Sequence, residues 1–256
     1  TLLFGGVLIK FLKKKQVGET IRDLGLKGQM EKSGTPTMGG VIILAGILIP
    51  TLLFAKLNNI YIQLMIISTI WLGVIGFIDD YIKVFKKNKK GLAGKFKILG
   101  QIGVGIIVGV ALYFSNDVTI MSKVDVPIEN TQHLTENNQE TTDWVQTKST
   151  KTTIPFIKNN EFDYAWLLTW IDEDLAKYVW LIFIPLVVII VTAVSNGANI
   201  TDGLDGLATG TSAIIGTTLA IFAYLSGNIV FADYLNIIYI PNAAELVIFI
   251  SSFVGA

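Results

Sequence analysis

Five long stretches without a charged residue constrain the fold of this chain more than any other feature. They cover residues 38–55, 60–78, 98–114, 179–201 and 206–232. The hydrocarbon core of a bilayer is about 30 Å thick, and a helix of roughly 20 apolar residues crosses it. We therefore predict an all-α, polytopic transmembrane helical bundle with five near-complete spans. Two shorter apolar pieces, 2–12 and 243–256, are predicted to be partial spans.

The basic residues are concentrated in two segments between these stretches. Of the 20 lysines and arginines, seven lie between residues 10 and 32 and seven lie between residues 83 and 97. The positive-inside rule places both segments on the cytoplasmic side of the membrane. Alternation of the spans then places the turn 196–206 on the same side and the long segment 115–178 outside. This segment carries five lysines against eleven acidic residues, in agreement with that topology.

The same pattern predicts the domain organisation. We interpret residues 1–256 as a single integral-membrane domain, in which 115–178 is an extracytoplasmic loop insertion. Within it, residues 115–160 are predicted to be an exposed loop that is partly hairpin. Residues 162–178 mix aromatic and acidic side chains, as is typical of a stretch at the membrane interface. Because the chain begins and ends inside apolar runs, we expect a fragment that is truncated at both ends.

The composition excludes several classes of function. The 20 acidic residues balance the 20 basic ones, and this argues against a nucleic-acid partner. The chain has no cysteine, which excludes disulfides, zinc–thiolate sites and a thiol nucleophile. The single histidine, His133, lies in the polar external segment, where we interpret it as solvated. The chemistry that remains is that of carboxylates, amides, hydroxyls and lysines.

The first of three polar motifs precedes the span at 38–55. It reads Lys-Ser-Gly-Thr-Pro-Thr-Met-Gly-Gly and runs from Lys32 to Gly40. Backbone amides at the start of the following helix, together with the hydroxyls of Thr35 and Thr37 and the ammonium group of Lys32, would cradle a phosphate or diphosphate. A simple turn explains much of the same stretch, because Thr caps helices and Gly allows close helix packing. Both interpretations stay open at this point.

The second motif is a pair of adjacent carboxylates, Asp79 and Asp80, where a span meets the cytoplasm. The C-terminal end of a helix carries partial negative charge, so two acids there need a compensating cation. Lys83 lies three and four residues further on and would pair with both, which is the structural alternative. A metal ion is the functional alternative. Magnesium fits an oxygen-only site, because it takes one or two carboxylates together with substrate phosphate oxygens.

The third motif is a ladder of polar side chains at every third position, Asn196, Asn199, Asp202 and Asp205, at the cytoplasmic end of the next long span. Neighbouring members lie on one helical face. All four face one ligand only if the helix tightens or breaks at the glycines 203 and 206. A calcium-type loop or a simple turn is the alternative, although calcium loops place their acids at alternate positions.

Together and in this order, the three motifs resemble those of the polyprenyl-phosphate N-acetylhexosamine-1-phosphate transferases. The stretches that carry the resemblance are GTPTMGG at 34–40, DDYIK at 79–83 with Gly91-Leu92 and residues 95–101 behind it, and NITDGLDGLA at 199–208. Within that family they are signatures of the branch that uses UDP-MurNAc-pentapeptide. The resemblance covers residues 10–114 and 179–256.

The resemblance implies a multi-pass enzyme of the bacterial inner membrane with its active site on the cytoplasmic face. Such an enzyme transfers phospho-MurNAc-pentapeptide from UDP-MurNAc-pentapeptide to undecaprenyl phosphate, a membrane lipid. The products are lipid I and UMP, in peptidoglycan synthesis, and the implied cofactor is Mg²⁺.

The residues that match the family motifs receive implied roles. The implied catalytic residues are Lys32, Asp79, Asp80 and Asp202, and the implied metal ligands are Asp80 and Asp202. The implied substrate-binding residues are Thr35, Thr37, Lys83, Lys95, Lys97, Asn196, Asn199, Gly203, Leu204 and Asp205. The family also has a third essential Asp, a further metal ligand, and a triple-histidine loop, which we expect beyond Ala256.

Two other functions stay open. A UDP-GlcNAc undecaprenyl-phosphate GlcNAc-1-phosphate transferase, which primes teichoic acid or O-antigen synthesis, shares the acidic motifs, although the full GTPTMGG favours the first function. A cation-coupled transporter would use the same carboxylates as ion ligands. Transporter sites lie near the bilayer midplane, whereas these acids lie at span ends on one side. The sequence defines no oligomeric state and leaves a homo-oligomer open.

Overall fold

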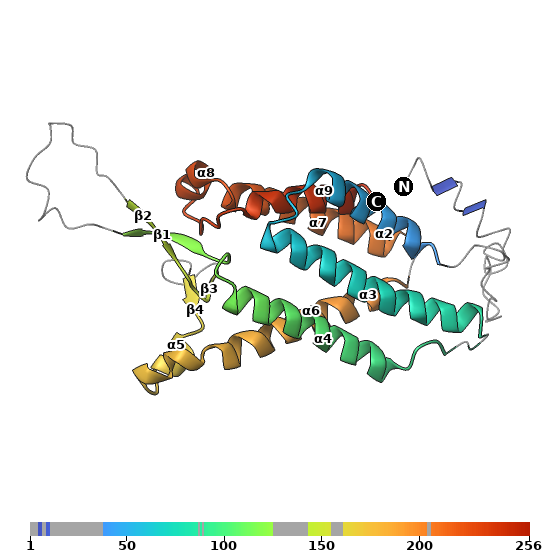
Figure 1. Ribbon diagram of the computed structural model, residues 1–256, viewed down its shortest axis with the longest axis horizontal. Helices are drawn as coiled ribbons and strands as arrows, with labels where there is room; N and C mark the ends of the chain where they lie inside the picture. The colour runs from blue at the N-terminus through green and yellow to red at the C-terminus, as the bar shows by residue number, and fades with distance from the viewer. Residues whose placement is uncertain are drawn as a thin grey trace, which may run out of the picture.

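The structure is a computed structural model that describes residues 5–6, 9–10, 38–86, 88, 90–124, 143–154, 161–203 and 206–256. Most of this part of the chain is helical (Figure 1). The helices are α2 (Gly40–Phe54), α3 (Ile60–Val84), α4 (Gly94–Phe114), α5 (Trp166–Thr169), α6 (Trp180–Thr201), α7 (Leu207–Ser226), α8 (Ile229–Tyr234) and α9 (Leu246–Val254). Two short 3-10 helices, η3 (Glu173–Tyr178) and η4 (Ala243–Glu245), precede α6 and α9.

The predicted polytopic helical fold is confirmed. Four helical segments of the described chain are long and apolar enough to cross a bilayer, namely Ile60–Val84, Gly94–Phe114, Glu173–Thr201 and Leu207–Ser226. The stretch at 38–55 forms α2, whose 15 residues span only about 22 Å at 1.5 Å per residue. The apolar piece at 243–256 forms η4 and α9. Most of the piece at 2–12 lies outside the described residues.

The predicted span at 206–232 is too long. Helix α7 ends at Ser226, and α8 begins a new direction at Ile229. The break is built into the sequence, because the Asn228 side chain accepts hydrogen bonds from the backbone N–H groups of Val230 and Phe231 and so caps α8. Gly227 lies against the backbone of Ala244, where a larger residue would collide.

Helices α4 and α6 form the closest pairing in the bundle. They run antiparallel, and two glycines of α4 let the backbones approach. A Cβ atom on Gly105 would lie 2.8 Å from Cα of Val188, and one on Gly109 would lie 3.3 Å from Cα of Ile184. Small residues at helix contacts are typical of membrane proteins, where close backbone packing replaces the hydrophobic effect as the attraction between helices. A small buried cluster of Ile47, Ile62 and Phe249 joins α2, α3 and α9.

The helix ends gather at two opposite ends of the bundle (Figure 1). One end holds the start of α2, the end of α3, the start of α4, the end of α6 and the start of α7. The other end holds the β-strands and α8. The segments that carry the second and third motifs therefore lie at the same end, as the predicted topology requires.

The described residues of the segment 115–178 lie at the opposite end and form two small antiparallel hairpins. Strand β1 (Ile120–Val124) pairs with β2 (Asp143–Thr147), and β3 (Lys151–Thr153) pairs with β4 (Glu161–Asp163). Met121 also bridges to Tyr239, which docks the first hairpin on the segment after α8. The interpretation of this segment as partly hairpin is confirmed. His133 lies outside the described residues.

Candidate active site

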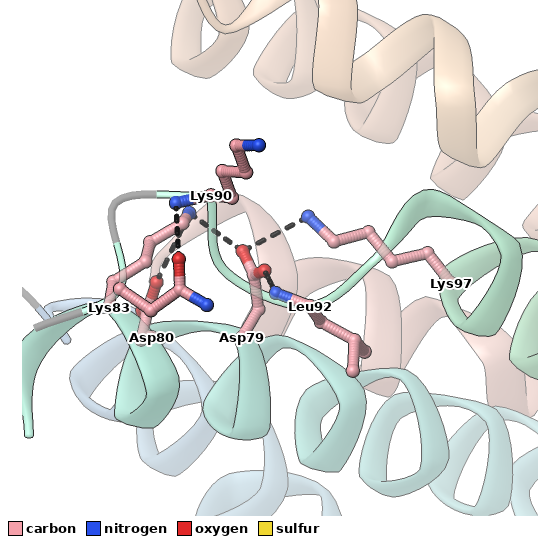
Figure 2. Close-up of polar contacts among 7 residues, drawn as sticks. Asp79, Asp80, Lys83, Lys90, Leu92 and Lys97 are labelled. Carbon is pink, nitrogen blue, oxygen red and sulfur yellow. Dashed lines mark hydrogen bonds and ion pairs between the residues drawn. The ribbon is translucent and has the colours of Figure 1, made fainter. Parts of the chain in front are cut away.

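Asp79 lies near the end of α3 and is held by three donors. Its Oδ2 atom is 2.7 Å from Nζ of Lys83 and 3.0 Å from Nζ of Lys97. Its Oδ1 atom accepts a hydrogen bond of 2.7 Å from the backbone N–H of Leu92. Figure 2 shows the two ammonium groups approaching this carboxylate from opposite sides. Both oxygens of Asp79 are thus engaged, and its side chain is only 10% exposed.

Asp80 has different surroundings, although it is the next residue. Its side chain is 40% exposed, and its Oδ1 atom is 3.9 Å from Nζ of Lys83, at the limit of an ion pair. Lys83 therefore contacts both acids, as the spacing predicted, but it contacts Asp79 much more closely. The ion-pair alternative therefore holds closely for Asp79 and at a longer distance for Asp80, whose side chain is also the more exposed of the two.

The segment between α3 and α4 closes over Asp79. Gly91 has a left-handed backbone conformation with φ of +64°, and its N–H donates to the carbonyl of Asn88. The Asn88 side chain in turn accepts from the backbone N–H of Lys90. This tight turn delivers the Leu92 N–H to Asp79 and starts α4, whose first turns carry Lys95 and Lys97. Lys95 is exposed, with its ammonium group 5.3 Å from the ring centre of Phe96.

A polar network fixes the end of α6 against α4. The Gln101 side chain donates to Oγ of Ser195 and accepts from the Asn196 amide, over 3.0 and 2.9 Å. Asn196 also donates to the backbone carbonyl of Thr192. Because the helices are antiparallel, this network places the last turn of α6, with Asn199, beside the first turns of α4.

Helix α6 ends where the Asn–Asp ladder needs it to break. The helix stops at Thr201, Asp202 is its C-terminal cap, and Gly206 has φ of +79° before α7 begins. Asn196 and Asn199 are therefore helical, while Asp202 and Gly203 already lie in the turn. Asn199, Asp202 and Gly203 are exposed. Leu204 and Asp205 lie outside the described residues.

Most of the first motif, residues 32–37, also lies outside the described residues. Lys32, Thr35 and Thr37 belong to this group, so their predicted roles remain predictions. The structure describes the motif only from Met38, which is 9% exposed and precedes α2. This start of α2 lies at the same end of the bundle as the end of α3 (Figure 1), which carries Asp79 and Asp80.

The carboxylates at this end are of the chemical type that magnesium binds. Among the described residues, no three acidic or histidine side chains come together as a metal cluster. Asp79 has both oxygens engaged, but Asp80 and Asp202 are at least partly exposed at the same end of the bundle. Magnesium commonly keeps several waters and binds through one or two carboxylates and phosphate oxygens. The donor set therefore fits this ion in company with a diphosphate.

Two of the groups that organise this end received no role from the sequence, although both lie in stretches that carry the family resemblance. Gln101 is 8% exposed inside a membrane-spanning helix, and the signal was available, because a buried amide in a span needs a partner on another helix. The hydrogen bond from the Leu92 N–H could not be predicted from the residue type, because nearly every residue has the same backbone donor.

A cavity of about 750 Å³ lies elsewhere, between the outer end of α4, the first hairpin and the start of α6. No predicted site residue lines it.

Comparison with known proteins now defines the class of this membrane protein. The model of glycosyl transferase family 4 matches residues 62–250, and the chain belongs to this family. A narrower pattern, signature 1 of phospho-N-acetylmuramoyl-pentapeptide-transferase, matches residues 32–44.

Individual relatives point to the same narrower group. The chain is 57% identical over 257 residues to the phospho-N-acetylmuramoyl-pentapeptide-transferase of Flavobacterium psychrophilum, covering 99% of the chain and 62% of that protein. It is 58% identical over 252 residues to the protein of the same name from Parabacteroides distasonis, covering 98% of the chain and 59% of the relative. The chain thus spans about 60% of the length of these relatives.

Proposed function

We propose that the full-length protein transfers phospho-MurNAc-pentapeptide from UDP-MurNAc-pentapeptide to undecaprenyl phosphate and releases UMP. The observation that carries this proposal is the close similarity to transferases of that name, which extends over nearly the whole chain and includes their first signature. The arrangement of acids and lysines at one end of a membrane bundle supports it, because the two substrates meet where membrane and water meet.

In this reaction the protein mainly positions the substrates and stabilises negative charge, and it need not form a covalent bond to them. A phosphate oxygen of the lipid forms a new bond to the phosphorus that carries the sugar, and the bond from this phosphorus to the oxygen of UMP breaks. The lipid phosphate is already largely ionised at neutral pH, so a general base adds little. Phosphoryl transfer depends mainly on positioning and on stabilising the negative charge of the transition state.

The described residues supply both signs of charge for this task. Lys83 and Lys97 meet at Asp79, and Lys95 extends from the first turn of α4. Cationic groups next to a diphosphate lower the free energy of the charge that develops on the leaving UMP. We assign Asn196, Asn199 and Gly203, with Leu204, Asp205, Thr35, Thr37 and Lys32, to the substrate-binding surface on the basis of their motifs.

We propose Mg²⁺ as the cofactor, with Asp80 and Asp202 as the side chains that would hold it. When bound, the ion would neutralise charge on the diphosphate. Asp79 serves a different purpose in this proposal, since its oxygens already accept from two lysines and a backbone N–H. In this proposal the protein lies in the bacterial inner membrane. The site would face the cytoplasm, because the basic segment 83–97 lies at this end of the bundle.

A donor comparison tests the proposal. The full-length protein, purified in detergent with undecaprenyl phosphate and Mg²⁺, receives either UDP-MurNAc-pentapeptide or UDP-GlcNAc, and release of UMP and formation of the lipid product are measured. We expect both products with the muramoyl donor and none with UDP-GlcNAc. Product formation from UDP-GlcNAc, with none from the muramoyl donor, would contradict the proposal and favour a GlcNAc-1-phosphate transferase.

A further inference from the structure

Gly91 occupies the tightest point of the segment that closes over Asp79. Its φ of +64° lies in the left-handed region, which side chains with a Cβ atom rarely adopt. Its neighbour in the chain, Leu92, donates its backbone N–H to Asp79 over 2.7 Å. The backbone therefore passes directly beside the carboxylate at this position.

A side chain at this position would have no room. A Cβ atom built on Gly91 would collide with Oδ1 of Asp79 and would lie 2.7 Å from Cε of Lys83. One of these atoms is the carboxylate oxygen that receives the Leu92 N–H, so it cannot move without losing that hydrogen bond. The second belongs to the lysine that pairs with the other oxygen of the same carboxylate.

The close approach has a consequence for α4. Six residues after Gly91, Lys97 places its ammonium group 3.0 Å from Asp79, so one carboxylate joins α3, the connecting turn and α4. Figure 2 shows these groups converging from the two helices and the turn. The positions of Lys83 and Lys97 are thus set by one carboxylate, and the position of this carboxylate depends on a glycine at 91.

We propose that Gly91 is a positioning residue of the transferase site, which acts through Asp79 to hold the ammonium groups of Lys83 and Lys97 in place. The proposal rests on the proposed function for its kinetic consequence, but its geometric content is independent of any activity. A misplacement of about 1 Å in such a site is enough to cost up to about a hundredfold in rate.

Gly91→Ala tests the kinetic consequence, with Gly94→Ala as the matched control. A Cβ atom on Gly94, three residues further on, would meet nothing within 4 Å. We expect Gly91→Ala to lower kcat by about tenfold or more, with little change in KM for the UDP donor. Alanine at positive φ also costs stability, so kcat is measured below the melting temperature of the variant. Gly94→Ala should keep the kcat of the unmodified protein. Equal kcat in the two variants would overturn the proposal.

A zero-length cross-link tests the geometry without activity. A carbodiimide condenses a carboxylate with an amine that touches it, so the folded protein should yield a peptide that joins Asp79 to Lys97. We expect this product in the unmodified protein and in Gly91→Ala a clear loss of it, while Gly94→Ala retains it. Retention of the link in Gly91→Ala would overturn the proposal. A failure of the unmodified protein to release UMP would instead refute the proposed function and leave this readout valid.

Two further variants keep the test decisive. Gly91→Asn adds a Cβ atom but tolerates positive φ, so we expect it to lose the cross-link as well. A normal link in Gly91→Asn would show that backbone strain alone matters and would contradict the proposed collision. If Gly91→Ala does not fold, the double variant Asp79→Ala/Gly91→Ala should recover folding, because the nearer of the two collision partners is gone and Lys83 is no longer held against Gly91 by its pairing with Asp79. A double variant that recovers no folding would overturn the role assigned to Asp79.

Discussion

Asp79 and Asp80 are adjacent in the sequence, but they differ in burial and in the groups that they contact. Asp79 is largely buried and accepts from Lys83, Lys97 and the Leu92 N–H. Asp80 is more exposed, and its Oδ1 atom lies 3.9 Å from Nζ of Lys83. Residues of an α-helix point in directions about 100° apart from one position to the next, so adjacent acids naturally separate into an inward and an outward group. The motif alone could not distinguish the two carboxylates.

At the scale of single residues, we predict that Asp80→Asn and Asp202→Asn each lower the turnover of the full-length protein by at least about a hundredfold. Each change removes a negative charge from the proposed magnesium site and keeps the shape of the side chain. UMP release and the melting temperature in detergent are measured side by side. Asp117→Asn is the control, since Asp117 is exposed at the opposite end of the bundle. Near-normal turnover in Asp80→Asn or Asp202→Asn would remove that residue from the site.

At the scale of helices, the uncharged stretches predicted where the spans lie but not where they end. Helix α3 continues past Asp79 and Asp80 to Val84, and α4 begins at Gly94, before Lys95 and Lys97. Charged residues can continue a helix at these ends because they form ion pairs or are exposed at the end of the bundle. Hydropathy marks only the apolar part of such a helix, so it does not show where the helix ends. The break between α7 and α8 was missed because apolar residues flank Gly227 and Asn228 on both sides.

Which helices pair with one another could also not be predicted from the sequence. Gly105 and Gly109 form the small-residue pattern typical of helix contacts in membranes, but this pattern does not say which helix is the partner. The structure pairs this face with α6. Similarly, the Asn–Asp ladder can face one ligand only if the helix tightens or breaks at Gly203 and Gly206, and the structure ends the helix just before them, at Thr201. What the ladder could not predict is that Asn196 donates its amide to Gln101.

The α4–α6 contact gives a stability prediction. Gly105→Ala should lower the free energy of unfolding by about 1–3 kcal/mol, because the new Cβ atom would lie 2.8 Å from Cα of Val188 and the backbones must separate. Gly76→Ala in α3 is the control, since nothing lies within 4 Å of its Cβ position; it should change stability by no more than about 0.5 kcal/mol. Thermal unfolding in one detergent compares the two variants. Equal stability would show that this contact is loose.

At the scale of the whole molecule, the bundle gathers segments that are distant in sequence at one end. The turn after α3, the start of α4 and the end of α6 meet there, while both hairpins lie at the other end (Figure 1). Charge counting predicted this grouping, because each loop belongs to one side of the membrane or the other. The docking of the first hairpin on the segment after α8, through Met121 and Tyr239, carried no sequence signal.

The orientation of the bundle in the membrane can be read by cysteine labelling. The chain has no cysteine of its own, and Asn88 and Asn116 are exposed asparagines at opposite ends of the bundle. In intact cells, a membrane-impermeant thiol reagent should modify Asn116→Cys and leave Asn88→Cys unmodified until the membrane is opened. The reverse pattern would invert the topology and place the acids outside.

The central claim is that a soluble UDP-linked donor reacts at the end of the bundle that carries Asp79, Asp80 and Asp202, and that this end faces the cytoplasm. UMP release from externally added UDP-MurNAc-pentapeptide, measured in sealed membrane vesicles of either orientation, tests it most directly. Vesicles that carry the full-length Asp80→Asn variant supply the background. We predict magnesium-dependent release above this background from inside-out vesicles, and release from right-side-out vesicles only after they are opened. Release from sealed right-side-out vesicles, or no release above background from either kind, would contradict the account.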